Sequence, residues 1–261
     1  MLKTKKINGE KVEPVIVSKL KPNKIKGYAL FPEIYANIFL CARKKSGKTS
    51  AIFKILQSCV NKDTKIVIFA STINKDDTLI HIVNYFKKKK NIVHTFTSIK
   101  EEKIDLLKEI LGTLKNDEEE EEEQINYVSI IEKYEEKKKK PRRSKIAPEI
   151  IFVFDDLGTD LKTPSIDQLL KTNRHFKSKV ILSSQYIHDL TPQGRRQIDY
   201  ALLFGGHSLE KLEIIYRDLD ISVPFDQFIE YYKDATKEKY HFLYIDVKDN
   251  KFRKDFNFEY L

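Results

Sequence analysis

The 261-residue sequence contains no tryptophan, one methionine and only two cysteines. Cys41 and Cys59 are too few for a disulfide framework, and their spacing matches no metal-binding motif, which suits a reducing compartment. No apolar run approaches the roughly 20 residues of a transmembrane helix, so we expect no integral membrane segment. The lysine-rich N-terminus also lacks the apolar stretch that is typical of a signal peptide.

Charge, in contrast, is abundant, and the formal net charge is +9. Lysine strongly outnumbers arginine, which fits the codon usage of an AT-rich genome better than a functional demand. Seven acidic residues stand together at Asp117–Glu123, so the rest of the chain is more basic than the total suggests. This balance suits contact with nucleic acid, although it does not by itself identify such contact.

Apolar blocks alternate with amphipathic stretches along most of the chain. Mostly apolar runs, typical of buried strands, occur at 37–41, 65–70, 91–96, 150–154, 179–183 and 201–204. Periodic apolar positions predict helices at 48–60, 76–86, 104–114, 164–176, 209–219 and 225–233. The last part, 240–258, predicts a C-terminal hairpin. This alternation indicates an α/β fold with a mostly parallel central sheet flanked by helices, which binds ligands at the carboxyl ends of its strands.

One loop has the pattern of a phosphate-binding P-loop. It consists of Ala42, Arg43, Lys44, Lys45, Ser46, Gly47, Lys48 and Thr49. In such a loop, backbone N–H groups point at phosphate oxygens, the lysine reaches the β and γ phosphates, and the threonine hydroxyl binds Mg²⁺. Ala42 replaces the usual first glycine, which its small side chain makes tolerable. The predicted strand before the loop and helix after it supply the required context, so we expect ATP and Mg²⁺ as ligands.

Two carboxylates support this interpretation. The apolar run 150–154 is followed by Asp155 and Asp156, and a P-loop needs a distant strand whose terminal aspartate meets the Mg²⁺. Asp155 fits that role, and Asp156 fits the role of general base for an attacking water. Without the P-loop, the same pair would indicate only a solvated strand end or a helix cap.

Further polar residues follow at positions that suit phosphate chemistry. Gln185 lies just past the next predicted strand, where its side chain can sense the γ-phosphate and orient water. Arg195 or Arg196 can act as an arginine finger on the ATP of a neighbouring subunit. A surface glutamine and solvated arginines are the alternatives. Arg174-His175, at a predicted helix end, is explained as simply by packing or by the helix dipole.

The order of these features resembles the poxvirus-type genome-packaging ATPases, which belong to the FtsK–HerA superfamily and occur in large nucleocytoplasmic DNA viruses and their virophages. The resemblance covers roughly residues 34–206 and, more weakly, the strand that ends at Asp246. Its specific part is the ordered series Asp155-Asp156, Arg174-His175, Val180–Gln185 and Gly194-Arg195.

The resemblance implies a RecA/FtsK-like P-loop fold and a role for each matching residue. Lys48 and Thr49 would bind nucleotide and metal, Asp155 the metal, and Asp156 would activate water. Gln185 would be the sensor and Arg195 the finger, although the adjacent Arg196 leaves that assignment open. It also implies a homo-oligomeric ring (pentamer or hexamer), a capsid vertex or portal-like partner, and a place in the virus factory of the host cytoplasm and in the virion.

We therefore expect a basic N-terminal arm at 1–33 and a P-loop ATPase domain at 34–261, with a charged mobile insertion at about 116–148. The predicted function is ATP-driven translocation of double-stranded DNA, independent of its sequence, into a viral capsid. The alternatives are a P-loop nucleotide or nucleoside kinase and a DNA-binding scaffold protein with a degenerate P-loop. The kinase is disfavoured because no motif for a small-molecule acceptor is present.

Overall fold

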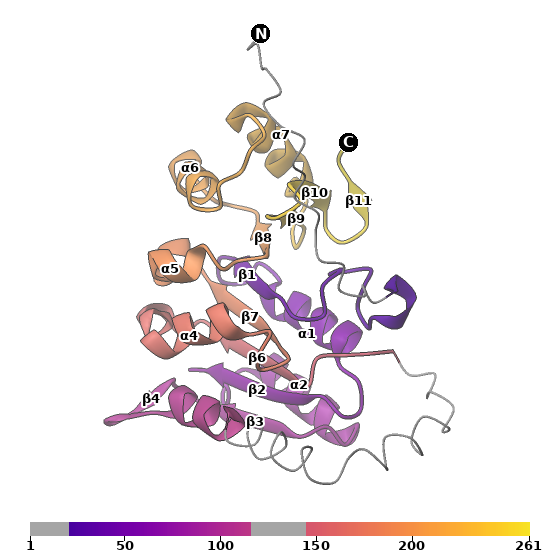
Figure 1. The fold of residues 1–261 in the computed structure, drawn as a ribbon. Coiled ribbons are helices and arrows are strands. Elements are labelled where there is room, and N and C mark those ends of the chain that lie inside the picture. The colour runs from indigo at the N-terminus through magenta and orange to yellow at the C-terminus, as the bar shows by residue number, and fades with distance from the viewer. Residues whose placement is uncertain (1–20, 116–144) are drawn as a thin grey trace, which may run out of the picture.

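The structure is a computed structural model that describes residues 21–115 and 145–261 (Figure 1). Its centre is a nine-stranded sheet in the order β11-β10-β9-β8-β1-β7-β6-β2-β3. The strands are β1 (Asn37–Cys41), β2 (Lys65–Ala70), β3 (Val93–Phe96), β6 (Ile150–Asp155), β7 (Ser178–Ser184), β8 (Tyr200–Phe204), β9 (Phe242–Asp246), β10 (Lys251–Lys254) and β11 (Phe258–Glu259). From β8 to β3 all neighbours are parallel, whereas β9, β10 and β11 pair in antiparallel fashion. The predicted mostly parallel sheet is thus confirmed.

Helices connect most of the strands. They are α1 (Lys48–Cys59), α2 (Asp77–Lys88), α4 (Pro164–Thr172), α5 (Pro192–Arg195), α6 (Leu209–Asp218) and α7 (Phe225–Ala235), with a further helical stretch at 106–115. Short 3₁₀ helices occupy Pro22–Lys24, Gly158–Lys162 and Ile187–Asp189, and a small hairpin pairs β4 (Lys100–Glu101) with β5 (Ile104–Asp105). None of the helices that the structure describes combines the length and apolar character needed to cross a membrane.

Alternate residues of the central strands face opposite sides of the sheet, and each side has its own apolar cluster. In β1, Phe39 belongs to the cluster that includes residues of α4, α6 and α7. Its neighbours Ile38 and Leu40 belong to the cluster formed with α1 and α2, which Figure 1 shows on the other side of the sheet from α4. Because both faces are buried, the strands are apolar throughout rather than alternating, as the sequence indicated.

Several helix boundaries differ from the sequence prediction by a few residues, and the cause is visible for two of them. The helix expected from Ile104 begins at residue 106 instead, because Ile104 and Asp105 pair with β4 in the small hairpin. The helix expected to reach residue 176 ends at Thr172. There the Asn173 carbonyl accepts hydrogen bonds from both the backbone N–H and the hydroxyl of Ser178, which turns the chain into β7.

The described part of the expected N-terminal arm packs onto the domain. Phe31 is buried, and its ring lies 5.0 Å from that of Tyr200 and 5.9 Å from that of Tyr244 between ring centres. Residues 1–20 lie outside the described part of the chain, as does the expected insertion except for residues 145–148. Of these four residues, Ile146 forms a β-bridge with Ile25. The bridge joins the beginnings of the two described segments, 21–115 and 145–261.

Candidate active site

The P-loop links the carboxyl end of β1 to the N-terminus of α1. Two of its residues have left-handed backbone conformations, Lys45 with φ 62° and Gly47 with φ 94°. Gly47 is the residue that caps α1, whose first residue is Lys48. At the other end of the loop, the Ala42 N–H donates to the Ser184 carbonyl over 3.0 Å. The free N–H groups and positive dipole end of α1 thus lie at the end of the loop, where an anion binds most favourably.

The P-loop lysine contacts both predicted carboxylates. Lys48 Nζ lies 3.2 Å from Asp155 Oδ1 and 3.3 Å from Asp156 Oδ2. Asp155 is the last residue of β6, and its side chain is buried. Burial raises the pKa of its carboxyl above the ordinary value, and the nearby Lys48 ammonium offsets part of this increase. Lys48 and the two carboxylates, which are more than a hundred positions from it in the sequence, therefore meet at the carboxyl end of the sheet.

Asp156 has an unusual backbone. Its φ is 55°, a left-handed conformation that costs free energy for a residue with a side chain, and its N–H donates to the Ser183 carbonyl over 3.1 Å. Such strain is concentrated at functional sites. Its side chain is 32% exposed, against 4% for Asp155, so the second carboxylate is the one that water reaches.

A hollow of about 660 Å³ opens above these groups. Its lining combines P-loop residues and both carboxylates with residues from other loops, namely Lys44, Lys45, Gly47, Lys48, Thr49, Ser50, Thr72, Asp76, Thr78, Asp155, Asp156 and Tyr240. The volume falls within the range of small-molecule sites. Ser46, whose buried hydroxyl has no hydrogen-bond partner among the described residues, does not line this hollow but an adjoining one that includes Arg43.

The donors at this hollow fit a magnesium ion. Mg²⁺ prefers oxygen ligands, and it commonly takes one or two carboxylates together with phosphate oxygens and water. Thr49 offers a hydroxyl and Asp155 a carboxylate, and both line the same hollow. Asp76 is less suited, because its side chain already accepts the N–H groups of Thr78 and Leu79 as the cap of α2.

Three of the predicted P-loop residues face a second hollow. Arg43, Lys44 and Lys45 are exposed, and with Lys237 and Lys239 they line a cavity of about 490 Å³ beside the loop. Five cations around one cavity favour phosphate groups. Lys44 and Lys45 line both hollows, whereas Arg43 belongs to the lining of the second and Lys48 to that of the first.

The remaining predicted residues are not gathered at the first hollow. Gln185 is half-buried, and its backbone carbonyl accepts the Cys41 S–H, but its side chain does not line the hollow as the structure describes it. Arg174 pairs with Glu33 over 3.6 Å, next to the amino end of β7 and hence at the opposite end of the sheet. This placement supports a structural rather than a catalytic interpretation of Arg174-His175.

The two adjacent arginines differ. Arg195 Nη1 lies 2.7 Å from Asp218 Oδ2, and its side chain is only 13% exposed. His188 Nε2 approaches the same carboxylate oxygen to 3.0 Å. Arg196 is exposed, and within the described parts of the chain it forms no ion pair. The arginine that is free to reach another molecule is therefore Arg196 rather than Arg195.

Sequence reasoning missed two residues beside the loop. His207, after β8, contacts the Cys41 carbonyl through Nε2 over 3.2 Å, and its backbone N–H donates to the Tyr232 hydroxyl. Burial lowers the pKa of this imidazole, so it is neutral at pH 7. Tyr240 lines the first hollow from the segment before β9. Neither residue belongs to a motif, and only the strand order brings them to the P-loop.

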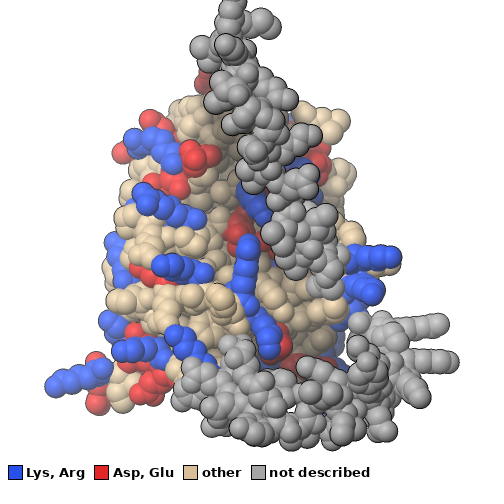
Figure 2. Space-filling model, viewed as in Figure 1, with Lys and Arg blue, Asp and Glu red and all other residues tan. Residues whose placement is uncertain are grey.

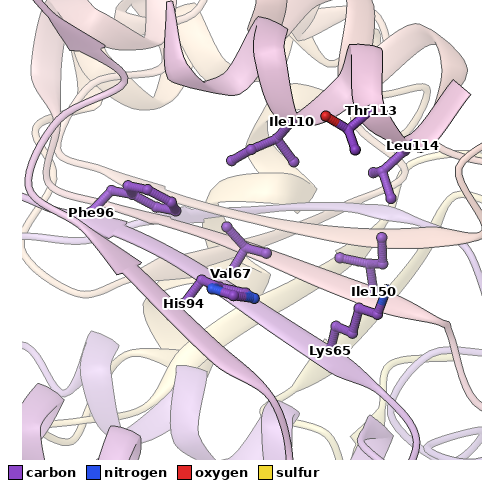
Figure 3. A pocket seen from close by; sticks show the side chains of 8 residues that line it. All are labelled: Lys65, Val67, His94, Phe96, Ile110, Thr113, Leu114 and Ile150. Carbon is purple, nitrogen blue, oxygen red and sulfur yellow. The ribbon is translucent and has the colours of Figure 1, made fainter. Parts of the chain in front are cut away.

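An apolar hollow of about 240 Å³ lies elsewhere, between the helical stretch 106–115 and the sheet (Figure 3). Figure 3 shows Ile110 and Leu114 on the helix above Val67 and Ile150 on the strands. Lys65, which also lines it, is the first residue of β2, so this hollow is at the amino ends of the strands. Nucleotides bind at the carboxyl ends, and the hollow is therefore separate from the P-loop site.

Solved structures with a similar fold include viral packaging enzymes. The genome packaging NTPase B204 from Sulfolobus turreted icosahedral virus 2, in complex with AMP, matches with a TM-score of 0.53 at 18% identity over 85% of this chain and 96% of its own. B204, the DNA-packaging ATPase from Sulfolobus turreted icosahedral virus, matches with a TM-score of 0.53 at 20% identity over 84% and 95%. The pCW3 conjugation coupling protein TcpA matches with a TM-score of 0.51 at 14% identity over 80% of this chain and 56% of its own.

These likenesses confirm the predicted P-loop NTPase fold. Among curated proteins, no sequence matches this one closely enough to count as a relative. The family of the poxvirus A32 protein, however, matches residues 78–255, which is more than half of the chain. The matched region contains both carboxylates, Gln185 and both arginines, whereas the P-loop itself precedes it. The chain belongs to the poxvirus A32 protein family, and the resemblance found in its sequence is confirmed.

Proposed function

We propose that this protein is an ATPase that moves double-stranded DNA into a viral capsid. The observation that carries this proposal is the contact of Lys48 with both strand-end carboxylates at the N-terminus of a helix. A P-loop cation beside paired carboxylates is suited to binding and hydrolysing a nucleoside triphosphate. Membership of the A32 family, and a fold shared with a DNA-packaging ATPase, support packaging as the task that hydrolysis drives.

Nucleotide binding changes the partners of Lys48. Without a ligand, its ammonium is divided between Asp155 and Asp156. A triphosphate competes for the same ammonium and also receives the N–H groups of the loop and of the first turn of α1. Asp155, released from the lysine, and Thr49 would then hold Mg²⁺. When bound, that ion would supply positive charge that offsets the charge of the phosphate groups.

Asp156 is the proposed general base. A water oxygen attacks the γ-phosphorus, the bond from that phosphorus to the ADP oxygen breaks, and the proton of the water passes to the Asp156 carboxylate. The left-handed backbone at Asp156 and the partial exposure of its side chain support this role. Gln185 remains a proposed sensor of the γ-phosphate, which requires its side chain to turn toward the hollow when nucleotide binds.

We further propose that the subunits form a ring, a pentamer or a hexamer, and that Arg196 completes the site of the neighbouring subunit. Arg196 is exposed, whereas Arg195 is paired with Asp218, so Arg196 is the better finger. An arginine supplied by a neighbour stabilises the charge that develops on the transferred phosphoryl group, and it makes hydrolysis in one subunit depend on the next.

The proposed DNA contact is with the phosphate backbone, which a motor indifferent to sequence requires. Figure 2 shows Lys and Arg side chains distributed among Asp and Glu on the described part of one face, rather than gathered into one basic patch. Five cations gather around the second hollow, beside the P-loop, together with Glu238. Partners at a capsid vertex and a place in the host cytoplasm and virion follow from the proposed task.

The test is ATP hydrolysis with and without long double-stranded DNA, with Lys48→Ala protein as the control for contaminating ATPases. DNA-stimulated phosphate release that disappears in Lys48→Ala supports the translocase. Transfer of phosphate to a nucleoside or nucleotide acceptor, in place of release, would instead make the protein a kinase. Binding of DNA without any turnover would make it a scaffold.

A further inference from the structure

Tyr240 is the most unusual aromatic residue near the P-loop. It is 67% exposed, and its φ of 72° places a bulky residue in the left-handed region. Aromatic side chains rarely adopt this conformation, and it persists where the surrounding structure holds it for a purpose. Among the described residues, its ring makes no contact with another aromatic ring or with a cation. Most of the side chain is thus exposed and available to a ligand.

The ring also lies directly on the P-loop. A Cβ atom added to Gly47 would be 3.1 Å from Tyr240 Cδ1, so the glycine and the tyrosine are in close contact. Tyr240 is part of the wall of the 660 Å³ hollow that contains Lys48 and the carboxylates. Tyr240 is also part of the wall of the second hollow and of a third hollow of about 530 Å³. The residue therefore borders both the phosphate-binding hollow and neighbouring spaces on the same loop.

The third hollow has the chemistry of a site for a heterocyclic base. Its lining includes the apolar side chains Ala51, Phe242 and Phe256, which suit the faces of a flat ring. It also includes His241 and Asp255, whose side chains lie 2.6 Å apart through Nδ1 and Oδ2. The Phe242 N–H holds the other Asp255 oxygen over 3.2 Å. The imidazole is thus held through Nδ1, and its Nε2 lies 3.7 Å from Glu238 Oε2.

The strand order gives the direction in which a nucleotide must lie. Asp155 and Asp156 follow β6, which is on one side of β1, with β7 between them. Tyr240 and His241 precede β9, which is on the other side of β1, beyond β8. The terminal phosphate lies with Lys48 and the carboxylates, so a nucleotide that crosses the P-loop carries its nucleoside end toward β9. The third hollow lies on that side.

We infer, on the basis of the nucleotide site proposed above, that Tyr240 stacks on the base of the nucleotide and that the hollow beside it holds that base. Every base has a flat face that can stack on an aromatic ring, whereas an inorganic polyphosphate has no base. Tyr240 would therefore favour binding of nucleotides over binding of inorganic polyphosphates. The polar pair His241 and Asp255 then meets the edge of the base. Binding of the phosphates does not depend on the Tyr240 ring.

The experiment compares the affinities of two ligands, ATP and inorganic tripolyphosphate, each with Mg²⁺, by isothermal titration calorimetry. Wild type is compared with Tyr240→Ala and Tyr240→Phe, and with Tyr28→Ala, which removes a partly exposed tyrosine elsewhere in the chain. We expect Tyr240→Ala to weaken ATP binding by about tenfold, the effect of losing one stacked base. Tripolyphosphate binding should not change, and Tyr240→Phe and Tyr28→Ala should bind both ligands as wild type does.

Three results would overturn the inference. The first is equal ATP affinity for Tyr240→Ala and wild type. The second is equal loss of ATP and tripolyphosphate, which would mean that Tyr240 only supports the P-loop through Gly47. The third is a wild type that binds ATP no better than tripolyphosphate. A wild type that binds neither ligand would instead contradict the proposed function, so the two failures are distinguishable.

Discussion

The two ends of the parallel sheet both carry buried charges, but the charges are arranged in different ways. At the carboxyl end, Lys48 lies between Asp155 and Asp156 at the edge of a large hollow. At the amino end, Lys179 is fully buried, donates to the Glu33 carbonyl over 2.8 Å, and has its pKa lowered by burial. Lys48 therefore borders a hollow that can hold a ligand, whereas Lys179 is enclosed by other parts of the protein.

The neighbours of Lys179 complete a closed network. The Glu33 carboxylate pairs with Arg174 over 3.6 Å and with Lys248 over 3.2 Å. The backbone N–H of Asn37 donates to the carboxylate of Asp199 over 2.7 Å. These contacts join the segment before β1 to β7, β8 and the turn after β9. Buried charge alone therefore does not identify a functional site, since it serves here to join segments, whereas an adjoining hollow and a strained backbone distinguish the P-loop end.

The largest effect that would sharpen this comparison, apart from loss of the P-loop lysine, is that of Asp156→Asn. The substitution keeps the size of the side chain and leaves Asp155 in place, but it removes the base that takes the proton of water. We expect ATP to bind with unchanged affinity while the rate of hydrolysis falls by roughly 10²-fold or more. Paired measurements of kcat and of nucleotide affinity check this, and a loss of affinity with little change in kcat would assign Asp156 to binding instead.

The adjacent arginines should separate stability from activity. Arg195→Ala removes a partly buried ion pair with Asp218, so we expect the free energy of unfolding to fall by about 1 to 2 kcal/mol. Arg196→Ala removes an exposed side chain, so stability should not change, whereas ATP hydrolysis by the assembled protein should fall. Chemical denaturation and hydrolysis assays on both variants test this.

Mixing experiments sharpen the same prediction. In mixed assemblies, Lys48→Ala subunits can lend an intact Arg196 to the sites of Arg196→Ala neighbours and restore part of the turnover. If Arg196→Ala hydrolyses ATP as wild type does, or if mixed assemblies form without any rescue, then no site is shared through this arginine. Reduced activity in Arg195→Ala without any loss of stability would assign the role of arginine finger to Arg195 instead of Arg196.

The smallest expected effect concerns the cost of keeping Asp155 charged. Because the pKa of its carboxyl is raised by burial, the folded protein binds that proton more tightly than the unfolded chain does. Its contribution to stability is therefore present at low pH and is lost as the pH rises through the raised pKa. Asp155→Asn removes this loss, so the ligand-free variant should be more stable than wild type at neutral pH while it loses Mg²⁺-dependent nucleotide binding.

Thermal unfolding of the ligand-free proteins across pH measures this difference. The advantage of Asp155→Asn should shrink as the pH falls toward the ordinary aspartate value of about 3.9. A variant that is less stable than wild type at neutral pH would show that the ion pair with Lys48 outweighs the cost of burial.

Most of the fold and half of the site could be predicted from the sequence. The bounds of β1 agree with the apolar run at 37–41, because a strand buried on both faces leaves an unbroken apolar signal. Lys48, Asp155 and Asp156 were found because the chemistry fixes their spacing and their places at strand ends. The end of α4 could not be predicted, because the helix ends where Ser178 hydrogen-bonds to the Asn173 carbonyl. That contact does not change the spacing of apolar residues in the sequence.

The residues on the β9 side of the P-loop could not be predicted. Tyr240 and His207 come from segments far along the chain, and they reach the loop only because β8 and β9 are added to the sheet beside β1. The pairing of Arg195 was likewise hidden, since Asp218 lies at the end of another helix. Local sequence indicates strands, helices and motifs, whereas contacts set by strand order require the structure.

The most direct test makes the same substitution at both ends of the sheet. Lys48→Met and Lys179→Met each replace a lysine with an apolar side chain of similar length, and initial rates of ATP hydrolysis are compared at equal protein concentration. We predict that Lys48→Met has no measurable turnover, because the β and γ phosphates of ATP lose the lysine ammonium that binds them. Lys179→Met should hydrolyse ATP at the wild-type rate, because that lysine only joins segments of the fold. Wild-type turnover in Lys48→Met, or lost turnover in a folded Lys179→Met, would contradict the assignment of the nucleotide site to the carboxyl end of the sheet.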